Sequence, residues 1–118
     1  MQFIMEMTSL NRVELRGRVG QDPRINDVGE SQVARFSIAT NETYKDKKGD
    51  LKEETTWHNI AVWSGKSVDD FRLLKKGSMV SVVGKLRMVK YTASSGEEKQ
   101  YTEVLANRMN VLQAEAGT

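Results

Sequence analysis

The sequence predicts an all-β protein, a five-stranded barrel with one short helix between the third and fourth strands. Three observations lead to this fold class. Short segments alternate apolar and polar residues, which is the pattern of strands that bury one face. Polar turns, several of them containing glycine, separate these segments. The length of 118 residues suits one domain around one hydrophobic core.

Five segments carry the alternation. In the first, for example, Val13 and Leu15 alternate with charged residues. Charged loops at residues 45–50 and 93–99 join the second strand to the third and the fourth to the fifth. The expected strands span residues 11–19, 32–40, 55–63, 79–91 and 101–112.

The short helix is expected at residues 67–76, where the alternation breaks. Val68, Phe71 and Leu74 recur at helical spacing. The serine that opens the segment suits an N-cap, and Gly77 suits the left-handed end of a helix. Three strands, a helix and two strands are the arrangement of an OB-fold, a barrel that binds oligonucleotides on one sheet face.

The third strand places its aromatic residues away from the core. Successive side chains of a strand point to opposite faces. Ile60 and Val62, with His58, mark the core side, so Trp57 and Trp63 lie on the other side, about 20 Å apart at ~3.3 Å per residue. Exposed rings of this size indicate a binding surface; the other interpretation is that the helix, a loop or a partner subunit covers them.

The fourth strand repeats the pattern. Its core side takes Val80, Val82, Leu86 and Met88, with Gly84 at a close approach or bend. Lys85, Arg87 and Tyr91 take the opposite side. Aromatic rings between cations suit single-stranded nucleic acid, because any base stacks on a ring for about 1–3 kcal/mol and cations neutralise phosphates. Tyr44, beside the first charged loop, is a further candidate ring.

Cations that contact phosphates are expected in the same region. Other basic residues compete for this role, namely Arg12, Arg16, Arg35 and Lys90. The residues expected to contact phosphates are Lys48, Lys66, Lys85 and Arg87.

Composition excludes most catalytic chemistry. The chain has no cysteine and one histidine, so thiolate zinc sites and catalytic triads are not expected. The acidic pairs lie beside lysines in loops or at the helix start, where solvation or capping explains them. We therefore expect no enzyme, no metal and no cofactor. The formal net charge of +2 means that a polyanion must bind through a local groove. No stretch is long enough to cross a membrane and no secretory signal is evident, so a cytoplasmic protein is expected.

Several motifs resemble one known family in the order of the chain. They are residues 17–23 (GRVGQDP), 36–40 (FSIAT), 57–58 (WH) and 76–78 (KGS). From Leu10 to Leu112 the chain resembles the bacterial single-stranded DNA-binding proteins (SSB). The resemblance implies an OB-fold subunit, a homotetramer and sequence-independent binding of single-stranded DNA in replication, repair and recombination.

The resemblance also implies roles for individual residues. It assigns Gly20 and His58 to the subunit interface. The best-known members have tryptophan at two stacking positions where this chain has tyrosine, and phenylalanine where it has Trp63. The turn at residues 64–66 is one residue longer than usual. The implied base-stacking residues are Tyr44, Trp57, Trp63 and Tyr91.

The ends of the chain leave an alternative open. Residues 10–112 form the expected DNA-binding domain, with an N-terminal extension at 1–9 and a short C-terminal remnant at 113–118. Family members usually continue to an acidic, aromatic tip that docks replication and repair proteins, and residues 113–118 contain no such tip. The alternative is a tail-less OB-fold paralogue that acts mainly as a primosome-type protein-interaction subunit. The four retained aromatic positions argue against it.

Overall fold

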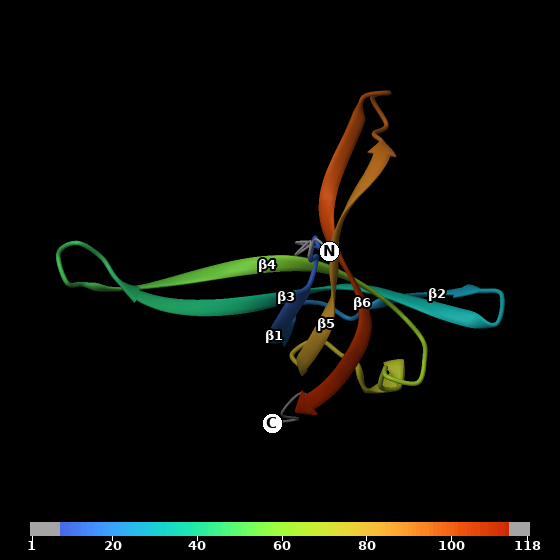
Figure 1. Ribbon diagram of the computed structural model, residues 1–118, viewed down its shortest axis with the longest axis horizontal. Helices are drawn as coiled ribbons and strands as arrows, with labels where there is room; N and C mark the ends of the chain where they lie inside the picture. The colour runs from blue at the N-terminus through green and yellow to red at the C-terminus, as the bar shows by residue number, and fades with distance from the viewer. Residues whose placement is uncertain (1–7, 114–118) are drawn as a thin grey trace, which may run out of the picture.

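Six β-strands account for most of the described part of the chain, residues 8–113, in this computed structural model (Figure 1). The N-terminal extension expected at residues 1–9 and the remnant expected at 113–118 lie almost wholly outside the described residues. Among residues 8–113, no helix is long and apolar enough to span a bilayer. The strands are β1 (Val13–Val19), β2 (Arg24–Val28), β3 (Ser31–Lys45), β4 (Leu51–Trp63), β5 (Met79–Thr92) and β6 (Glu98–Gln113).

Five of these strands close into a barrel. Along the sheet their order is β1-β5-β6-β4-β3, and β1 also pairs with β3, which joins the two ends. Only the pairing of β4 with β6 is parallel among the described strands. The all-β, five-stranded OB-fold barrel predicted from the sequence is confirmed.

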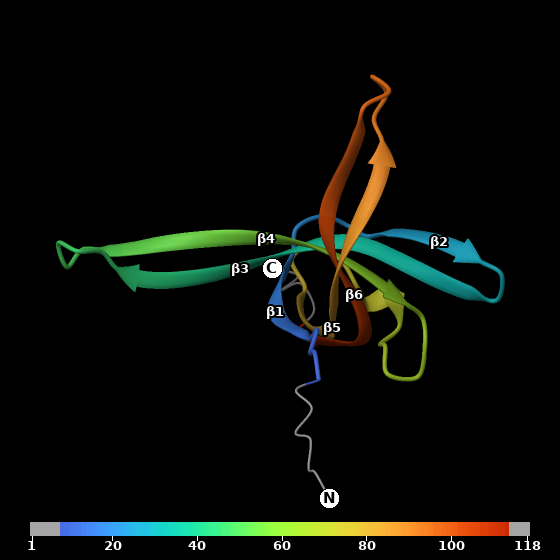
Figure 2. The ribbon, with the colours of Figure 1, turned by 45° about the horizontal axis from the view of Figure 1, so that its top comes forward.

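Two long hairpins extend from the barrel as arms, as Figures 1 and 2 show. The β3–β4 arm continues to the pair Lys45↔Leu51, and the β5–β6 arm continues to Thr92↔Glu98. The radius of gyration is therefore 17.8 Å, compared with about 13 Å for a compact domain of 100 residues. The second and third expected strands are too short, because the sequence pattern ends where the arm leaves the core.

The sequence does not predict β2. All five of its residues are exposed, and it pairs only with β3. A strand without a buried face shows no alternation of apolar and polar residues. The β2–β3 hairpin turns at Gly29, whose φ of 62° is a conformation that glycine adopts without strain.

The core lies inside the barrel and confirms the face predicted for the third strand. Val62 and Ile60 of β4 point inward, whereas Trp57 and Trp63 do not belong to the core. Apolar side chains from all five barrel strands meet there. The largest fully buried ones are Ile38, Ile60, Met109, Val62, Val80 and Val82.

Two residues expected in the core are exposed. Leu86 and Met88 are 45% and 53% exposed, because beyond Gly84 strand β5 passes from the barrel into its arm. The close approach expected at Gly84 is confirmed. A Cβ at this position would lie 2.1 Å from the carbonyl oxygen of Leu105, and the β5–β6 register shifts here, as at a β-bulge.

The helix expected at residues 67–76 is wrong except for one 3₁₀ turn, η1 (Phe71–Leu73). The first residues of the segment pair with β6 instead: the amide of Met109 donates to the carbonyl of Ser67, and the amide of Asp69 donates to the carbonyl of Met109. Phe71 and Leu74 are still buried. The apolar spacing therefore identified residues that reach the core. A single 3₁₀ turn, rather than a longer helix, brings them there.

Asp70, rather than the serine at position 67, caps the 3₁₀ turn. Its side chain accepts a hydrogen bond from the Arg72 amide. Hydrogen bonds from the Arg72 side chain and then from that amide lower the pKa of Asp70 to about 2. Gly77 has a φ of 89°, which confirms the left-handed conformation predicted for it.

Candidate functional site

The barrel presents one continuous surface on which the predicted aromatic residues lie. We call it the outer face and define it by alternate residues of three neighbouring strands. The strand registers place these residues on the same side of the sheet. They are Val33, Arg35, Ser37 and Ala39 of β3, Trp57, Asn59, Ala61 and Trp63 of β4, and Tyr101, Glu103 and Leu105 of β6.

Both tryptophans of the chain are accessible on the outer face. Trp57 is 60% exposed and Trp63 is 39% exposed. The Trp57 ring lies against Gly20, where a Cβ would come within 2.5 Å of the ring atom Cζ3. Trp63 lies beside Lys66 in a hollow of about 360 Å³. No element of residues 8–113 fully covers either ring, so both offer a surface for a planar ligand.

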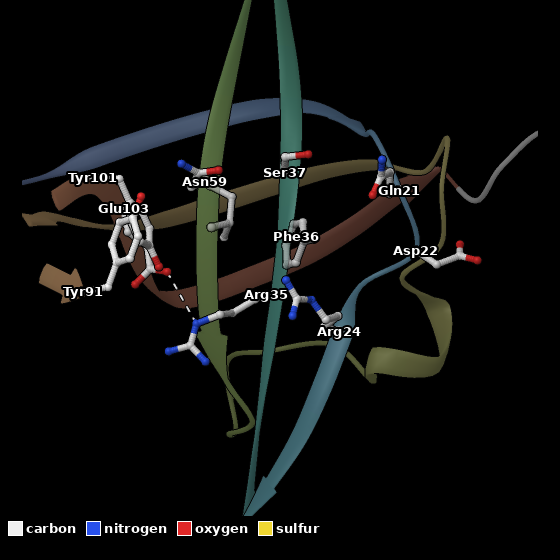
Figure 3. Close-up of a pocket in the computed structure, with 11 residues that line it drawn as sticks. Gln21, Asp22, Arg24, Arg35, Phe36, Ser37, Asn59, Tyr91, Tyr101 and Glu103 are labelled. Carbon is white, nitrogen blue, oxygen red and sulfur yellow. Dashed lines mark ion pairs between the residues drawn. The ribbon is translucent and has the colours of Figure 1, made fainter. Parts of the chain in front are cut away.

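A larger hollow of about 570 Å³ lies on the outer face between β2, β3 and the β5–β6 arm (Figure 3). We call it the tyrosine–arginine hollow. Its walls include Tyr91 and Tyr101, whose ring centroids are 5.9 Å apart with planes tilted by 60°. Arg24 and Arg35 line it as well. It therefore combines aromatic rings, the side chains on which bases can stack, with cations, the side chains that can neutralise phosphates.

A buried carboxylate stands in the wall of this hollow. Glu103 is 2% exposed. Arg87 donates to its Oε1 atom from Nε at 3.0 Å and from Nη2 at 2.7 Å. The Nε atom of Arg35 lies 3.6 Å from its other oxygen, Oε2, the contact that is dashed in Figure 3. Arg87, which was expected to contact phosphate, therefore already donates two hydrogen bonds to the Glu103 carboxylate.

The other predicted phosphate contacts do not gather in one place. Lys85 is exposed on β5, opposite Leu105 of β6. Lys66 follows the end of β4 beside Trp63. Lys48 belongs to the turn at the tip of the β3–β4 arm, where its amide donates to Asp46.

Tyr44 also lies on the β3–β4 arm, away from the other rings. It is half exposed and pairs with Lys52. In β3 it follows the alternation of the core residue Ile38 rather than that of the outer-face residue Ala39. The arm, rather than the barrel face, would have to bring Tyr44 to a ligand.

Gly20 and His58 have clear local contacts. Gly20 leaves space for the Trp57 ring. The Nε2 atom of His58 lies 2.9 Å from the Thr40 hydroxyl in a partly buried position. Their role in subunit contacts stays a prediction.

Of the residues that line the hollow, only Tyr91 was among the predicted site residues, and the sequence reasoning missed Arg24, Tyr101 and Glu103 altogether. Arg24 belongs to β2, which the sequence does not reveal. Tyr101 and Glu103 lie on β6, and the hairpin register pairs Tyr101 with Val89 and Glu103 with Arg87. If the two strands are paired residue by residue outward from the 93–99 loop, Tyr101 comes near Tyr91, so the sequence could have predicted this neighbour. Within residues 8–113, no group of three or more histidine or acidic residues could hold a metal ion.

Comparisons with known proteins agree with this geometry. A family model described as the single-strand binding protein family matches residues 10–112. A single-stranded DNA-binding protein of Neisseria meningitidis is 37% identical over 105 residues, which are 88% of this chain and 60% of that protein. The chain thus spans about 60% of the length of this relative. The mitochondrial single-stranded DNA-binding protein of the mouse is 37% identical over 117 residues, covering 92% of this chain and 77% of its own.

Solved structures of single-stranded DNA-binding proteins are also similar to this chain. A structure described as Plasmodium falciparum SSB in complex with ssDNA superposes with a TM-score of 0.71 at 35% identity, covering 92% of this chain and 100% of the other. A single-stranded DNA-binding protein from Thermus aquaticus superposes with a TM-score of 0.72 at 23% identity, covering 88% of this chain and 51% of the other. The second likeness concerns the fold alone.

Proposed function

Because this chain belongs to the single-strand binding protein family, we propose that it binds single-stranded DNA without reading its sequence. It is a binding protein, without cofactor or metal, that covers exposed strands during replication, repair and recombination. The observation that carries the proposal is the outer face, on which both tryptophans and the tyrosine–arginine hollow are accessible together.

The physical basis is the same for each part of the face. Every base has a flat π-face, so stacking on Trp57, Trp63 or Tyr91 requires no particular sequence. Paired bases in a duplex are already stacked on each other, which makes unpaired strands the matching ligand. Lys66, beside Trp63, and Lys85, opposite Leu105 in the sheet, supply charge for phosphates. Tyr44 and Lys48 contribute from the β3–β4 arm.

We also propose that the protein acts as a homotetramer. Several large apolar side chains are exposed on the single subunit, among them Leu86, Met88 and Leu112, and association is the usual way to cover such area. Gly20 and His58 belong to the proposed interface. Docking of replication and repair proteins and the cytoplasmic location stay predictions; one relative is described as mitochondrial.

Intrinsic tryptophan fluorescence tests the proposed function directly, because the two tryptophans of the chain are both on the outer face. Titration with a thymidine oligomer should quench the emission until it saturates. High salt should shift the midpoint to weaker binding, because phosphate contacts release counterions. A folded protein that shows neither quenching nor a mobility shift with the oligomer would contradict the proposal. The protein-interaction alternative would then be favoured.

A further inference from the structure

Two arginines face each other in the tyrosine–arginine hollow. Arg24 and Arg35 are direct partners in the β2–β3 register, and side chains of such partners stand side by side on one face. Like charges in this arrangement destabilise a sheet. A negative charge that the two guanidinium groups share would relieve this repulsion.

The chain itself supplies only part of that charge. Glu103 is 3.6 Å from Arg35 but is already held by two hydrogen bonds from Arg87. Arg24 forms no ion pair with any residue in the described range 8–113. Asp22 also lines the hollow, but its Oδ1 atom accepts the backbone amide of Lys76 at 2.9 Å. The Arg24 guanidinium is thus available to a ligand.

The position of the pair favours a phosphate next to a stacked base. Figure 3 shows both side chains extending from β2 and β3 across the sheet, in the direction of Tyr91 and Tyr101. The volume of about 570 Å³ lies within the range of about 300–1,000 Å³ of small-molecule sites. Guanidinium groups match phosphate oxygens with paired hydrogen bonds.

Strand β2 places Arg24 in this arrangement. None of its residues is buried, so it adds nothing to the core. Pairing with β3 holds the backbone of Arg24 opposite Arg35, and the Glu103 carboxylate restrains Arg35. The backbone of Arg24 and the side chain of Arg35 are therefore held in place before any ligand arrives, which reduces the entropy lost on binding.

We propose that the tyrosine–arginine hollow is a subsite for one nucleotide of the bound strand, in which Arg24 and Arg35 share a single phosphate while the neighbouring base stacks on the Tyr91–Tyr101 pair. The inference rests on the proposed function and adds to it a phosphate contact from a strand that lies outside the five-stranded barrel.

The test is a double-mutant cycle on binding of a thymidine oligomer, followed by tryptophan fluorescence at several salt concentrations. Arg24→Ala should weaken binding at low salt about tenfold, the loss of one charge-assisted hydrogen bond. Arg35→Ala should have a similar effect. Because both side chains bind the same phosphate, the double variant should lose less than the product of the two single losses. Its slope of log affinity against log salt should fall by about 0.7, the value for one phosphate of a single strand.

Arg72→Ala is the matched control, since it removes the same charge from the 3₁₀ turn outside the hollow. It should leave both affinity and salt slope unchanged. Arg24→Ala that behaves like Arg72→Ala would overturn the subsite. Losses that multiply in the double variant would mean two separate phosphates and would overturn the shared contact. Failure of the unmodified protein to bind the oligomer would instead refute the proposed function itself.

Discussion

Trp57 has the most exposed ring of the outer face, and its position depends on a glycine. The ring rests against Gly20 and is still 60% exposed, so it is supported on one side while most of its surface is open. A supported ring loses little freedom when a base stacks on it. Single-residue changes at these two positions therefore separate stacking from ring placement.

Replacing Trp57 with alanine should weaken binding to every oligomer by about 1–3 kcal/mol. The loss should be similar for thymidine, adenosine and cytidine oligomers, because stacking does not read hydrogen-bonding groups. Fluorescence polarisation with labelled oligomers measures it. Leu73→Ala is the control, an exposed apolar residue on η1. Equal affinity of Trp57→Ala and the parent would remove Trp57 from the site.

Gly20→Ala should displace the Trp57 ring without unfolding the barrel. The new Cβ would lie 2.5 Å from the ring, and an exposed side chain can rotate away at small cost. We expect a shifted tryptophan emission and weaker quenching by the oligomer. Leu73→Ala is the control, because Leu73 is an exposed residue of η1 that lines neither hollow of the outer face. Unchanged emission in Gly20→Ala would show that the ring does not depend on this glycine.

At the scale of elements, the close approach of β5 and β6 at Gly84 fixes where the barrel ends and the arm begins. A side chain there would collide with backbone atoms of Leu105 and Ala106, which cannot rotate away. Gly84→Ala should therefore lower the free energy of unfolding by about 1–3 kcal/mol or more. Urea unfolding of Gly84→Ala, Gly65→Ala and the parent measures the difference; a Cβ at Gly65 meets nothing within 4 Å. A Gly84→Ala protein as stable as the parent would mean that the strands can separate here without cost.

The elements differ in how far the sequence predicts them, and burial explains the difference. Where one face is buried, as at Ile60 and Val62 of β4, alternation gave the strand and also placed Trp57 and Trp63 correctly. Where no face is buried, as in β2 and in the β3–β4 arm, there was no alternation to detect. The expected helix failed because backbone hydrogen bonds to β6 compete with helix formation.

The candidate site was also predicted only where a strand has one buried face. The rings of β4 could be placed from their own strand, since only local alternation was needed. The contact between the Tyr91 and Tyr101 rings depends on the register between β5 and β6. The position of Arg24 opposite Arg35 depends on β2, a strand that the sequence pattern does not predict. Contacts between strands are therefore the part that the sequence alone leaves open.

At the scale of the whole molecule, the protein is a small closed barrel with long projecting arms. The resemblance to the family implies a homotetramer, and the exposed apolar side chains of the subunit offer area for its contacts. Light scattering should therefore give a mass in solution about four times the 13.3 kDa of the chain. The mass should not change with dilution through the range in which the oligomer titration is carried out. A mass of one chain would contradict the proposed homotetramer.

The place of β6 in the sheet has a consequence for how the chain folds. β6 lies between β5 and β4, although it is the last strand of the described residues along the chain. During synthesis the barrel therefore cannot close until β6 has left the ribosome, and until then β4 and β5 each lack a neighbour. Pairings as distant in sequence as Val13 with Gly84 must also form, and such topologies fold in about milliseconds to seconds. The nascent chain thus has to keep its unpaired strand edges from other chains until the final strand is inserted.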